Sequence, residues 1–482
     1  MPVQHERSEL AVQSERAVVA AVRLPDSRFD RVNPFGEIRS LAEQAGANVV
    51  GELTQNLTRP FPATYMGPGK VEELKALCEA LDAKTIIFDH DLTPKQIGNI
   101  EKATLRKVLD RSELILDIFA SRATSAEAKL QVELAQLEYT YPRLKAMWSH
   151  LERITGGIGS RGPGEQQLEI DRRLVQSRKD DLKRAIAEVQ DRKRREVQRR
   201  KLEHFTVGVV GYTNAGKSTL FNTLTSGGAY ADDRLFATLM TRTREWDLAG
   251  GLTVMLSDTV GFVRDLPHNL IAAFRATLEE ATHADLLLIV VDVSDPAAQM
   301  QLDTVTSTLD GLIGEVAERE ARLNQKYTPP PRLLLLNKAD RLADNRDLLV
   351  WQQRDPSAIP ICALDPVRVP EAAHSPYRAG IEAVRRAVLD AARGEVEALD
   401  ITIPLAESKT VHLVENRAEV VDRRYTDTHV TLAARIGAKV LARLRAGGAR
   451  FTVASPDGGE VVLPEPDAGP IRPTGWSNAA HA

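Results

Sequence analysis

The sequence predicts a multidomain α/β protein, and three observations carry this prediction. With 482 residues, of which 43% are hydrophobic, the chain has enough material for about three domains with buried cores. Apolar, strand-like runs alternate with helix-like stretches across residues 205–393, which is typical of a mostly parallel sheet covered by helices. Before them, residues 121–204 show long helical periodicities without a strand pattern.

Composition excludes several classes of protein. The longest apolar run, Leu286 to Val291, is too short to span a membrane, and the N-terminus MPVQHERSEL lacks the apolar core of a signal peptide. Cys78 and Cys362 lie far apart without metal-ligand spacing, so a reducing cytoplasm fits better than a disulfide scaffold. The net charge is only −4, so any contact with nucleic acid must come from a local concentration of Lys and Arg.

The first 120 residues are predicted to contain α/β structure. KTIIFDHDL, residues 84–92, contains a strand-like apolar run, and TYMGPGK, Thr64 to Lys70, places a glycine-rich turn before a helix. Gly-Pro-Gly-Lys lacks the rest of a phosphate-binding loop, so a simple turn and helix start is the preferred interpretation.

Residues 121–204 are predicted to form an antiparallel helical hairpin. Apolar residues recur at spacings of three and four from Leu130 to Leu151, and then every seven residues from Leu168 to Val189. Between them lies GGIGSRGPGE, Gly156 to Glu165, which matches the G-x-G-x-x-G pattern of dinucleotide-binding folds. That pattern needs a strand entering the turn, whereas a helix precedes it here, so we reject the match.

The hairpin loop is instead a candidate contact surface. Arms of about 25 residues would hold it roughly 40 Å from the hairpin base. The second arm is basic, since Asp191 to Lys201 has seven basic and two acidic residues, although a solvated helix face is an equal alternative. A plain connector is the other alternative, but this connection is long and rich in glycine. Pro142 is expected to kink or divide the first arm.

A phosphate-binding loop follows the hairpin. FTVGVV, Phe205 to Val210, reads as a buried strand that leads into a G-x-x-x-x-G-K-[ST] motif and a helix. Loop amides are expected to cradle the phosphates, Lys217 to contact the β- and γ-phosphates, and the Ser218 hydroxyl to ligate Mg²⁺. The predicted nucleotide-binding residues of this loop are Gly211, Tyr212, Thr213, Asn214, Ala215, Gly216, Lys217, Ser218 and Thr219.

Two further motifs predict a guanine nucleotide. In DTVGF, Asp258 is expected to hold Mg²⁺ directly or through water, and Gly261 to let its amide approach the γ-phosphate. In NKAD, the Asp340 carboxylate can accept from the ring N–H and the exocyclic amine of guanine, while the Lys338 stem lies over the base. Residues 205–393 are therefore predicted to form a GTPase domain. The contact residues predicted from these motifs are Asp258, Thr259, Val260, Gly261, Asn337, Lys338 and Asp340.

The switch segment is predicted at FATL, which lies where GTPases place the threonine that closes over Mg²⁺ and the γ-phosphate. Thr238 is the preferred residue for this role, and Thr241 and Thr243 are its competitors. The predicted nucleotide contacts of this segment are Phe236, Ala237 and Thr238.

Two positions bear on the rate of hydrolysis. Phe262 stands where Ras-like enzymes have the glutamine that orients the attacking water, so Lys217, Thr238 and Gly261 are the catalytic candidates and slow intrinsic hydrolysis is expected. Asn214 resembles the asparagine with which some potassium-stimulated GTPases hold K⁺, with stabilisation of a turn as the alternative.

The chain resembles the HflX family of ribosome-associated GTPases. The resemblance runs from roughly Ala17 to Arg445 and rests on YMGPGKVEEL, LILDIFASRA, KLQVELAQLEY, GGIGSRGPGE, GYTNAGKST and DTVGFVRDLPHNLIAAFRATLEEA. It implies a nucleotide-binding-like domain at 1–120, the hairpin at 121–204, the GTPase domain at 205–393 and a small α+β domain at 394–462. Residues 463–482 are predicted to be a disordered tail because Pro, Gly and Asp are frequent there.

The resemblance also implies a function. The family acts on the large ribosomal subunit and can separate stalled ribosomes, so we expect a monomeric cytoplasmic GTPase whose missing catalytic group the ribosome supplies. The hairpin loop would then reach ribosomal RNA near the peptidyl-transferase centre. An ATP-driven RNA remodelling factor using the N-terminal domain, and a GTP-gated binding module with little turnover, are the alternatives. The candidate RNA contacts are Arg153, Arg161, Gly162 and Gly164.

Two departures from the family pattern stand out. FATLMTRTRE lacks the Asp-Pro pair that usually follows FATL. The resemblance therefore does not extend past FATL in this segment, and the assignment of Thr238 rests on FATL alone. The base-contacting Ser-Ala turn is replaced by ICALDP, and a contact made by a backbone amide would tolerate the cysteine. The residues predicted for this turn are Cys362, Ala363 and Leu364.

Overall fold

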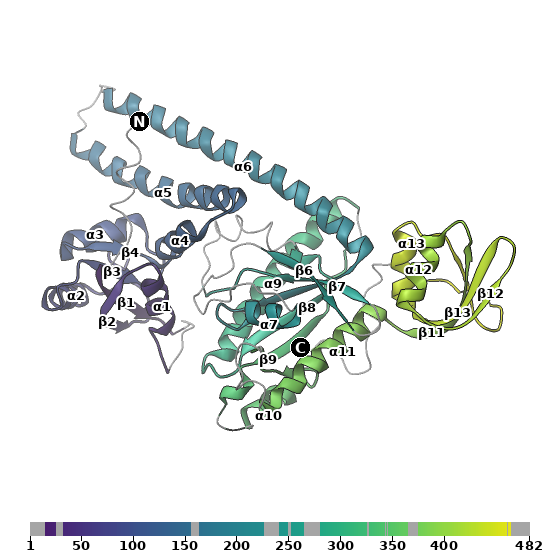
Figure 1. Ribbon diagram of the computed structural model, residues 1–482. Helices are drawn as coiled ribbons and strands as arrows, with labels where there is room; N and C mark the ends of the chain where they lie inside the picture. The colour runs from purple at the N-terminus through teal and green to yellow at the C-terminus, as the bar shows by residue number, and fades with distance from the viewer. Residues whose placement is uncertain are drawn as a thin grey trace. The chain divides into compact units, whose positions relative to one another are not determined.

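In the computed structural model, the described residues form two compact units. Their helices and strands are labelled in Figure 1. The first unit comprises the described residues up to Asp191 together with Arg264, and the second comprises the others. The described residues are 15–25, 32–155, 163–225, 241–248, 252–264, 280–324, 327–342, 344, 346–364, 375–459 and 461–463.

The first unit is built on a parallel sheet in the order β2-β1-β3-β4. Its two central strands are almost wholly buried and rich in Ala, Val and Ile, as expected of a sheet covered on both faces. The α/β fold predicted for this region is therefore confirmed. Its elements are β1 (Arg16–Arg23), α1 (Gly36–Gln44), β2 (Asn48–Asn56), α2 (Pro68–Ala80), β3 (Thr85–Phe88), α3 (Pro94–Thr104), β4 (Lys107–Leu109) and α4 (Arg111–Arg122).

A helical hairpin follows, formed by α5 (Ala126–Thr155) and α6 (Pro163–Glu203). The helices have 30 and 41 residues, so both are longer than the predicted arms, and α6 alone extends about 60 Å at the usual rise. The helix α5 continues through Pro142, so the predicted division of the first arm there is wrong. A proline removes one backbone donor, and the turns on either side still hydrogen bond.

The two helices of the hairpin pack against each other by side chains from their facing turns. Leu134, Leu182 and Ile186 form a buried cluster between them. Beside this cluster, Nε and Nη2 of Arg178 donate to the two carboxylate oxygens of Glu133, at 2.9 and 3.0 Å. The apolar contact explains why the hydrophobic periodicity in the sequence was sufficient to predict the hairpin.

The second unit contains a six-stranded sheet in the order β10-β9-β8-β5-β7-β6. All neighbours pair in parallel except β6 and β7, so the predicted mostly parallel sheet is confirmed. Its elements are β5 (Phe205–Gly211), α7 (Lys217–Leu224), β6 (Arg242–Asp247), β7 (Thr253–Asp258), β8 (Leu286–Asp292), α9 (Ala298–Arg322), β9 (Arg332–Asn337), η1 (Ala339–Arg341), α10 (Arg346–Arg354), β10 (Ile359–Pro360), η3 (Pro376–Arg378) and α11 (Ala379–Arg393).

The end of the second unit is an antiparallel sheet with two helices, in the strand order β12-β13-β11-β14. This agrees with the small α+β fold implied for the C-terminal region. Its elements are β11 (Val396–Pro404), α12 (Ser408–Arg417), β12 (Glu419–Tyr425), β13 (His429–Gly437), α13 (Ala438–Ala446) and β14 (Thr452–Ala454).

Among the described residues, none of the helices combines the length and the apolar character that crossing a bilayer would require.

Candidate nucleotide-binding site

The predicted nucleotide contacts converge on one edge of the six-stranded sheet. The strands β5, β7 and β9 run in parallel, so the segments that follow them meet at their carboxyl ends. The described residues that lie there are Gly211, Tyr212, Thr213, Asn214, Ala215, Gly216, Lys217, Ser218, Thr219, Asp258, Thr259, Val260, Gly261, Asn337, Lys338, Asp340, Cys362, Ala363 and Leu364.

The loop between β5 and α7 depends on two glycines. Gly211 has a φ of 156°, and a Cβ there would overlap the carbonyl oxygen of Val290 on the neighbouring strand. Gly216 has a φ of 95°, and a Cβ there would overlap the amide of Asn337. Both positions therefore need glycine for backbone conformation and for space.

Lys217 and Ser218 begin α7 and point to acceptors at the same edge. Lys217 is buried, and its Nζ donates to the carbonyl oxygen of Tyr212 at 2.6 Å. Burial lowers the pKa of Lys217 to about 8, and the nearby Asp258 carboxylate opposes this shift. The Ser218 hydroxyl donates to Asp258 Oδ2 at 2.7 Å.

The pair Ser218 and Asp258 fits Mg²⁺. Hydroxyl and carboxylate oxygens are the donors that this cation prefers, and Mg²⁺ in nucleotide sites takes its remaining ligands from phosphates and water. No cluster of three or more His, Cys, Asp or Glu suited to a metal occurs in the described part of the chain. Ser218 and Asp258 supply two oxygen donors, so a Mg²⁺ ion held here would take its other ligands from phosphates and water.

The DTVGF segment pairs with the phosphate-binding loop through its backbone. The Phe262 amide donates to Gly211 at 3.1 Å, and the Thr213 amide donates to the Phe262 carbonyl at 2.7 Å. A Cβ on Gly261 would lie only 2.7 Å from Thr213 Cγ2 and 2.9 Å from Lys217 Nζ. Glycine at 261 thus permits the close approach, and the Phe262 ring is buried in the core.

Asn337 and Thr259 have roles that the sequence did not reveal. Asn337 donates from Nδ2 to the Ala215 carbonyl at 2.7 Å and accepts the Ala363 amide at 3.1 Å, so it joins the phosphate-binding loop to the ICALDP turn. The Thr259 hydroxyl donates to the Val209 carbonyl at 2.8 Å inside the sheet. Both side chains hold the site together, and motif spacing alone gives no signal for either contact.

The residues predicted to lie near the guanine base also interact with other residues of the chain. Lys338 has a φ of 58°, and its Nζ lies 2.7 Å from Asp292 Oδ2 at the end of β8. Burial raises the pKa of the Cys362 thiol, and the nearby Asp340 raises it further. Cys362 is therefore adjacent to the residue predicted to read guanine. In the sequence, the only sign of this partner was that Asp292 is a carboxylate at the end of an apolar strand.

Several predicted residues cannot be placed at this edge. Thr238, with Phe236 and Ala237, lies outside the described residues. Of its competitors, Thr243 is on β6, where its hydroxyl lies 3.0 Å from Ser257 Oγ and donates to Glu280 at 3.1 Å. Thr243 is thus engaged in the sheet.

Two of the four candidate RNA contacts lie in the described helices of the hairpin. Arg161 and Gly162 fall outside the described residues. Arg153 lies in α5 and Gly164 lies in the first turn of α6.

The Gly-Pro-Gly-Lys segment of the first unit is a helix start. Gly67 is the N-cap of α2, Pro68 takes the first helical position, and Lys70 pairs with Glu73 at 2.8 Å. The local geometry agrees with the preferred interpretation of this segment.

Comparisons with known proteins agree with this architecture. Three family models match consecutive regions: "GTP-binding GTPase N-terminal" at residues 33–120, "GTP-binding GTPase Middle Region" at 122–201 and "50S ribosome-binding GTPase" at 206–338.

Curated relatives span most of the chain. A GTPase HflX from Caldanaerobacter subterraneus is 38% identical over 91% of this chain and 94% of its own length. A GTPase HflX from Lacrimispora saccharolytica is 50% identical over 62% of this chain and 71% of its own length. Among solved structures, a GTP-binding protein from Sulfolobus solfataricus in complex with GDP is 23% identical, with a TM-score of 0.39, and the match covers 78% of this chain and 99% of that chain.

Proposed function

We propose that this chain, which belongs to the HflX family of GTPases, binds the large ribosomal subunit, hydrolyses GTP there and separates stalled ribosomes. The chain is a P-loop GTPase that binds GTP and GDP. The observation that carries the ribosomal part is the match of residues 206–338 to the family described as 50S ribosome-binding GTPases. A ribosomal partner would place the protein in the cytoplasm, and we propose that it acts as a monomer.

In the proposed reaction, the loop amides and Lys217 bind the β- and γ-phosphates, and the Gly261 amide approaches the γ-phosphate. Ser218 and Asp258 would hold Mg²⁺, with Thr238 as a further proposed ligand. When bound, Mg²⁺ would neutralise charge on the phosphates. A phosphate would replace the Tyr212 carbonyl as the partner of Lys217 and favour its charged form.

Recognition of the base is proposed to rest on Asp340, with Lys338 beside it and with backbone groups of Cys362, Ala363 and Leu364. A cysteine in this turn is compatible with a backbone contact, because such a contact does not use the side chain. The Ala363 amide already donates to Asn337 Oδ1, so it would have to exchange this acceptor for guanine. The exposed Asn214 has a φ of 61°, as a turn asparagine often does, and stimulation by K⁺ is its alternative role.

The domain limits 1–120, 121–204, 205–393, 394–462 and 463–482 remain a proposal. Ends of elements support three of them: α4 ends at Arg122, α6 ends at Glu203 and α11 ends at Arg393.

The test is GTP turnover by the purified chain, alone and with increasing amounts of large ribosomal subunits. Because Phe262 is buried and apolar, we expect slow turnover alone and strong stimulation by the subunits. Lys217→Ala should abolish both activities, whereas any ATP-driven activity of the first unit would survive this change. Intact GTP binding without stimulation would contradict the ribosomal proposal and favour a GTP-gated binding module.

A further inference from the structure

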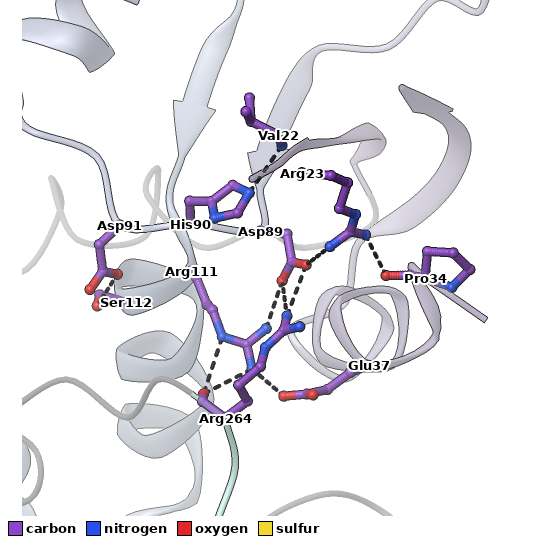
Figure 2. A network of polar contacts seen from close by, with 10 residues as sticks. All are labelled: Val22, Arg23, Pro34, Glu37, Asp89, His90, Asp91, Arg111, Ser112 and Arg264. Atoms are coloured by element: carbon purple, nitrogen blue, oxygen red, sulfur yellow. Dashed lines mark hydrogen bonds and ion pairs between the residues drawn. The ribbon is translucent and has the colours of Figure 1, made fainter. Parts of the chain in front are cut away.

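Side-chain hydrogen bonds join segments that are distant in the sequence within each of the two units. In the first unit, Arg111 donates to the buried Asp89 carboxylate at 2.8 Å (Figure 2). In the second unit, an uncharged contact of this kind lies next to the predicted nucleotide site. The Thr223 hydroxyl of α7 donates to the Ala363 carbonyl at 2.7 Å, across 140 positions of the sequence. Thr223 belongs to none of the motifs from which the site was predicted.

The backbone of Ala363 is held by side chains on both sides. Its amide donates to Asn337 Oδ1 at 3.1 Å, and its carbonyl oxygen accepts from Thr223. Asn337 ends β9 and Thr223 belongs to α7, so two different elements fix one short piece of main chain. Ala363 is itself buried, and a buried backbone group that loses its partner is costly. The two contacts therefore restrict the position of the ICALDP turn.

The helix that holds this turn also carries the phosphate side of the site. It begins with Lys217 and Ser218, which are predicted to bind the phosphates and Mg²⁺, and Thr223 lies in its last turn. At the usual rise, Thr223 is only about 8 Å along the helix axis from Ser218. The segment predicted to contact the base is thus fastened to the element predicted to bind the phosphates. All of these residues belong to the second unit.

The ICALDP turn lies beside the segment predicted to read guanine. The Ala339 amide donates to the Ile361 carbonyl at 3.3 Å, and the Ile361 amide donates to the Leu336 carbonyl at 2.8 Å. A backbone amide can only donate, and guanine offers its O6 carbonyl as an acceptor. The Asp340 carboxylate can only accept, so it suits the N–H groups of the base. The turn and Asp340 are therefore complementary to different groups of guanine.

We propose that Thr223 is a positioning residue for guanine recognition, which holds the ICALDP turn against α7 so that a backbone amide of the turn meets the O6 carbonyl of the base. This inference rests on the proposed function of the turn. The hydroxyl contact exists before the nucleotide binds, so the turn need not be ordered when the base arrives. GTP and GDP carry the same base, so the affinity for both depends on Thr223.

The experiment compares Thr223→Val with Thr225→Val in the full chain, with Kd and dissociation rates measured for GDP and GTP. Valine has the shape of threonine but cannot donate. Thr225 is the matched control, because its hydroxyl also donates to a carbonyl, that of Phe221 at 2.8 Å, but within its own helix. We expect Thr223→Val to raise both Kd values about fivefold, which corresponds to about 1 kcal/mol for one neutral hydrogen bond. Most of this change should appear in the dissociation rate. Thr225→Val should keep the wild-type values.

The chemical step should not depend on Thr223. Hydrolysis of bound GTP in a single turnover should stay within about twofold of wild type in Thr223→Val, because the base is bound equally in the ground state and the transition state. Thr223→Ser retains the hydroxyl, so its Kd should return to within about twofold of wild type. IDP lacks the exocyclic amine that Asp340 is predicted to bind, and Thr223→Val should weaken IDP and GDP by the same factor.

Four results would overturn the proposal: an unchanged Kd in Thr223→Val, an equal rise in Thr225→Val, no recovery in Thr223→Ser, or a smaller loss for IDP than for GDP. The last result would mean that Thr223 acts through Asp340 and not through the turn. A wild type that does not prefer GDP to ADP would refute the guanine site itself. A wild type with this preference and an unaffected Thr223→Val would refute only the positioning role.

Discussion

At the scale of single residues, His90 is a buried imidazole in a cationic surrounding. Its Nε2 accepts the backbone N–H of Val22 at 3.0 Å, so this nitrogen carries no proton. Burial lowers the pKa of His90 from 6.5 to about 4, while Asp89 attracts a proton and Arg23 and Arg264 repel one. The folded first unit therefore favours the neutral ring.

This predicts a loss of stability in mild acid. As the pH falls, the unfolded chain takes up a proton on His90 near pH 6.5, before the folded chain does near pH 4. The stabilisation is complete above pH 6.5 and is lost as the pH falls toward 4, by about 2 kcal/mol at pH 5. His90→Gln keeps an acceptor for Val22 but does not titrate. Urea unfolding of the first unit at pH 7 and pH 5 should show a smaller loss in this variant, and equal losses would contradict the prediction.

Residue types and spacing predicted which side chains meet at the carboxyl ends of β5, β7 and β9, because each motif is short and directly follows a strand. Lys217, Ser218 and Asp258 are of this kind. The sequence did not indicate that Asn337 joins two loops, or that Asp89 binds Arg264, because these contacts depend on packing between distant segments. No periodicity or motif specifies a pair separated by 175 positions.

At the scale of elements, hydrophobic periodicity predicted the hairpin but underestimated its length. The apolar repeat in the second arm ends at Val189, whereas α6 continues to Glu203. This last part is rich in Arg, Lys and Glu, which favour helix through intrinsic propensity and charge pairs and leave no apolar stripe to detect. The alternation of strands and helices likewise predicted parallel sheets. The order of the strands was not predicted, because it is set by pairing between segments that are distant in the sequence.

The length of the arms leads to a prediction for the loop between them. Arg161 lies in the sequence between α5 and α6, outside the described residues, and we propose that it contacts ribosomal phosphate. Arg161→Ala should weaken binding to the large subunit about tenfold, since charged hydrogen bonds contribute about 1.5–3 kcal/mol. Its affinity for free GTP should not change.

The matched control is Arg184→Ala, which removes the same charge from an exposed position in the α6 arm. Binding measured by sedimentation at several salt concentrations should show a shallower salt dependence for Arg161→Ala. Equal binding by the wild type and Arg161→Ala, or equal losses in both variants, would count against a specific contact of the loop.

At the scale of the whole molecule, the chain has separate hydrophobic cores. One lies in the first unit around β1 and β3, and includes Val18, Ile86 and Phe88. A second core, besides the small cluster in the hairpin, continues from the six-stranded sheet into the C-terminal sheet, from Phe205 to Val453. Arg443 of α13 also pairs with Asp285 at 3.0 Å and lies 4.6 Å from the Phe205 ring centroid. The GTPase and C-terminal regions therefore share one hydrophobic core, and we expect them to unfold together.

Separate cores predict separate thermal transitions, and a nucleotide should act on one of them. GDP with Mg²⁺ at about 100 times its Kd should stabilise the second unit by about 2.7 kcal/mol, because only the folded unit binds it. The transition of the first unit should not move, since the described residues predicted to contact the nucleotide all lie in the second unit. Calorimetry with and without GDP measures both transitions, and Lys217→Ala should abolish the shift. A single transition, or equal shifts of both, would contradict the prediction and mean that the two cores unfold together.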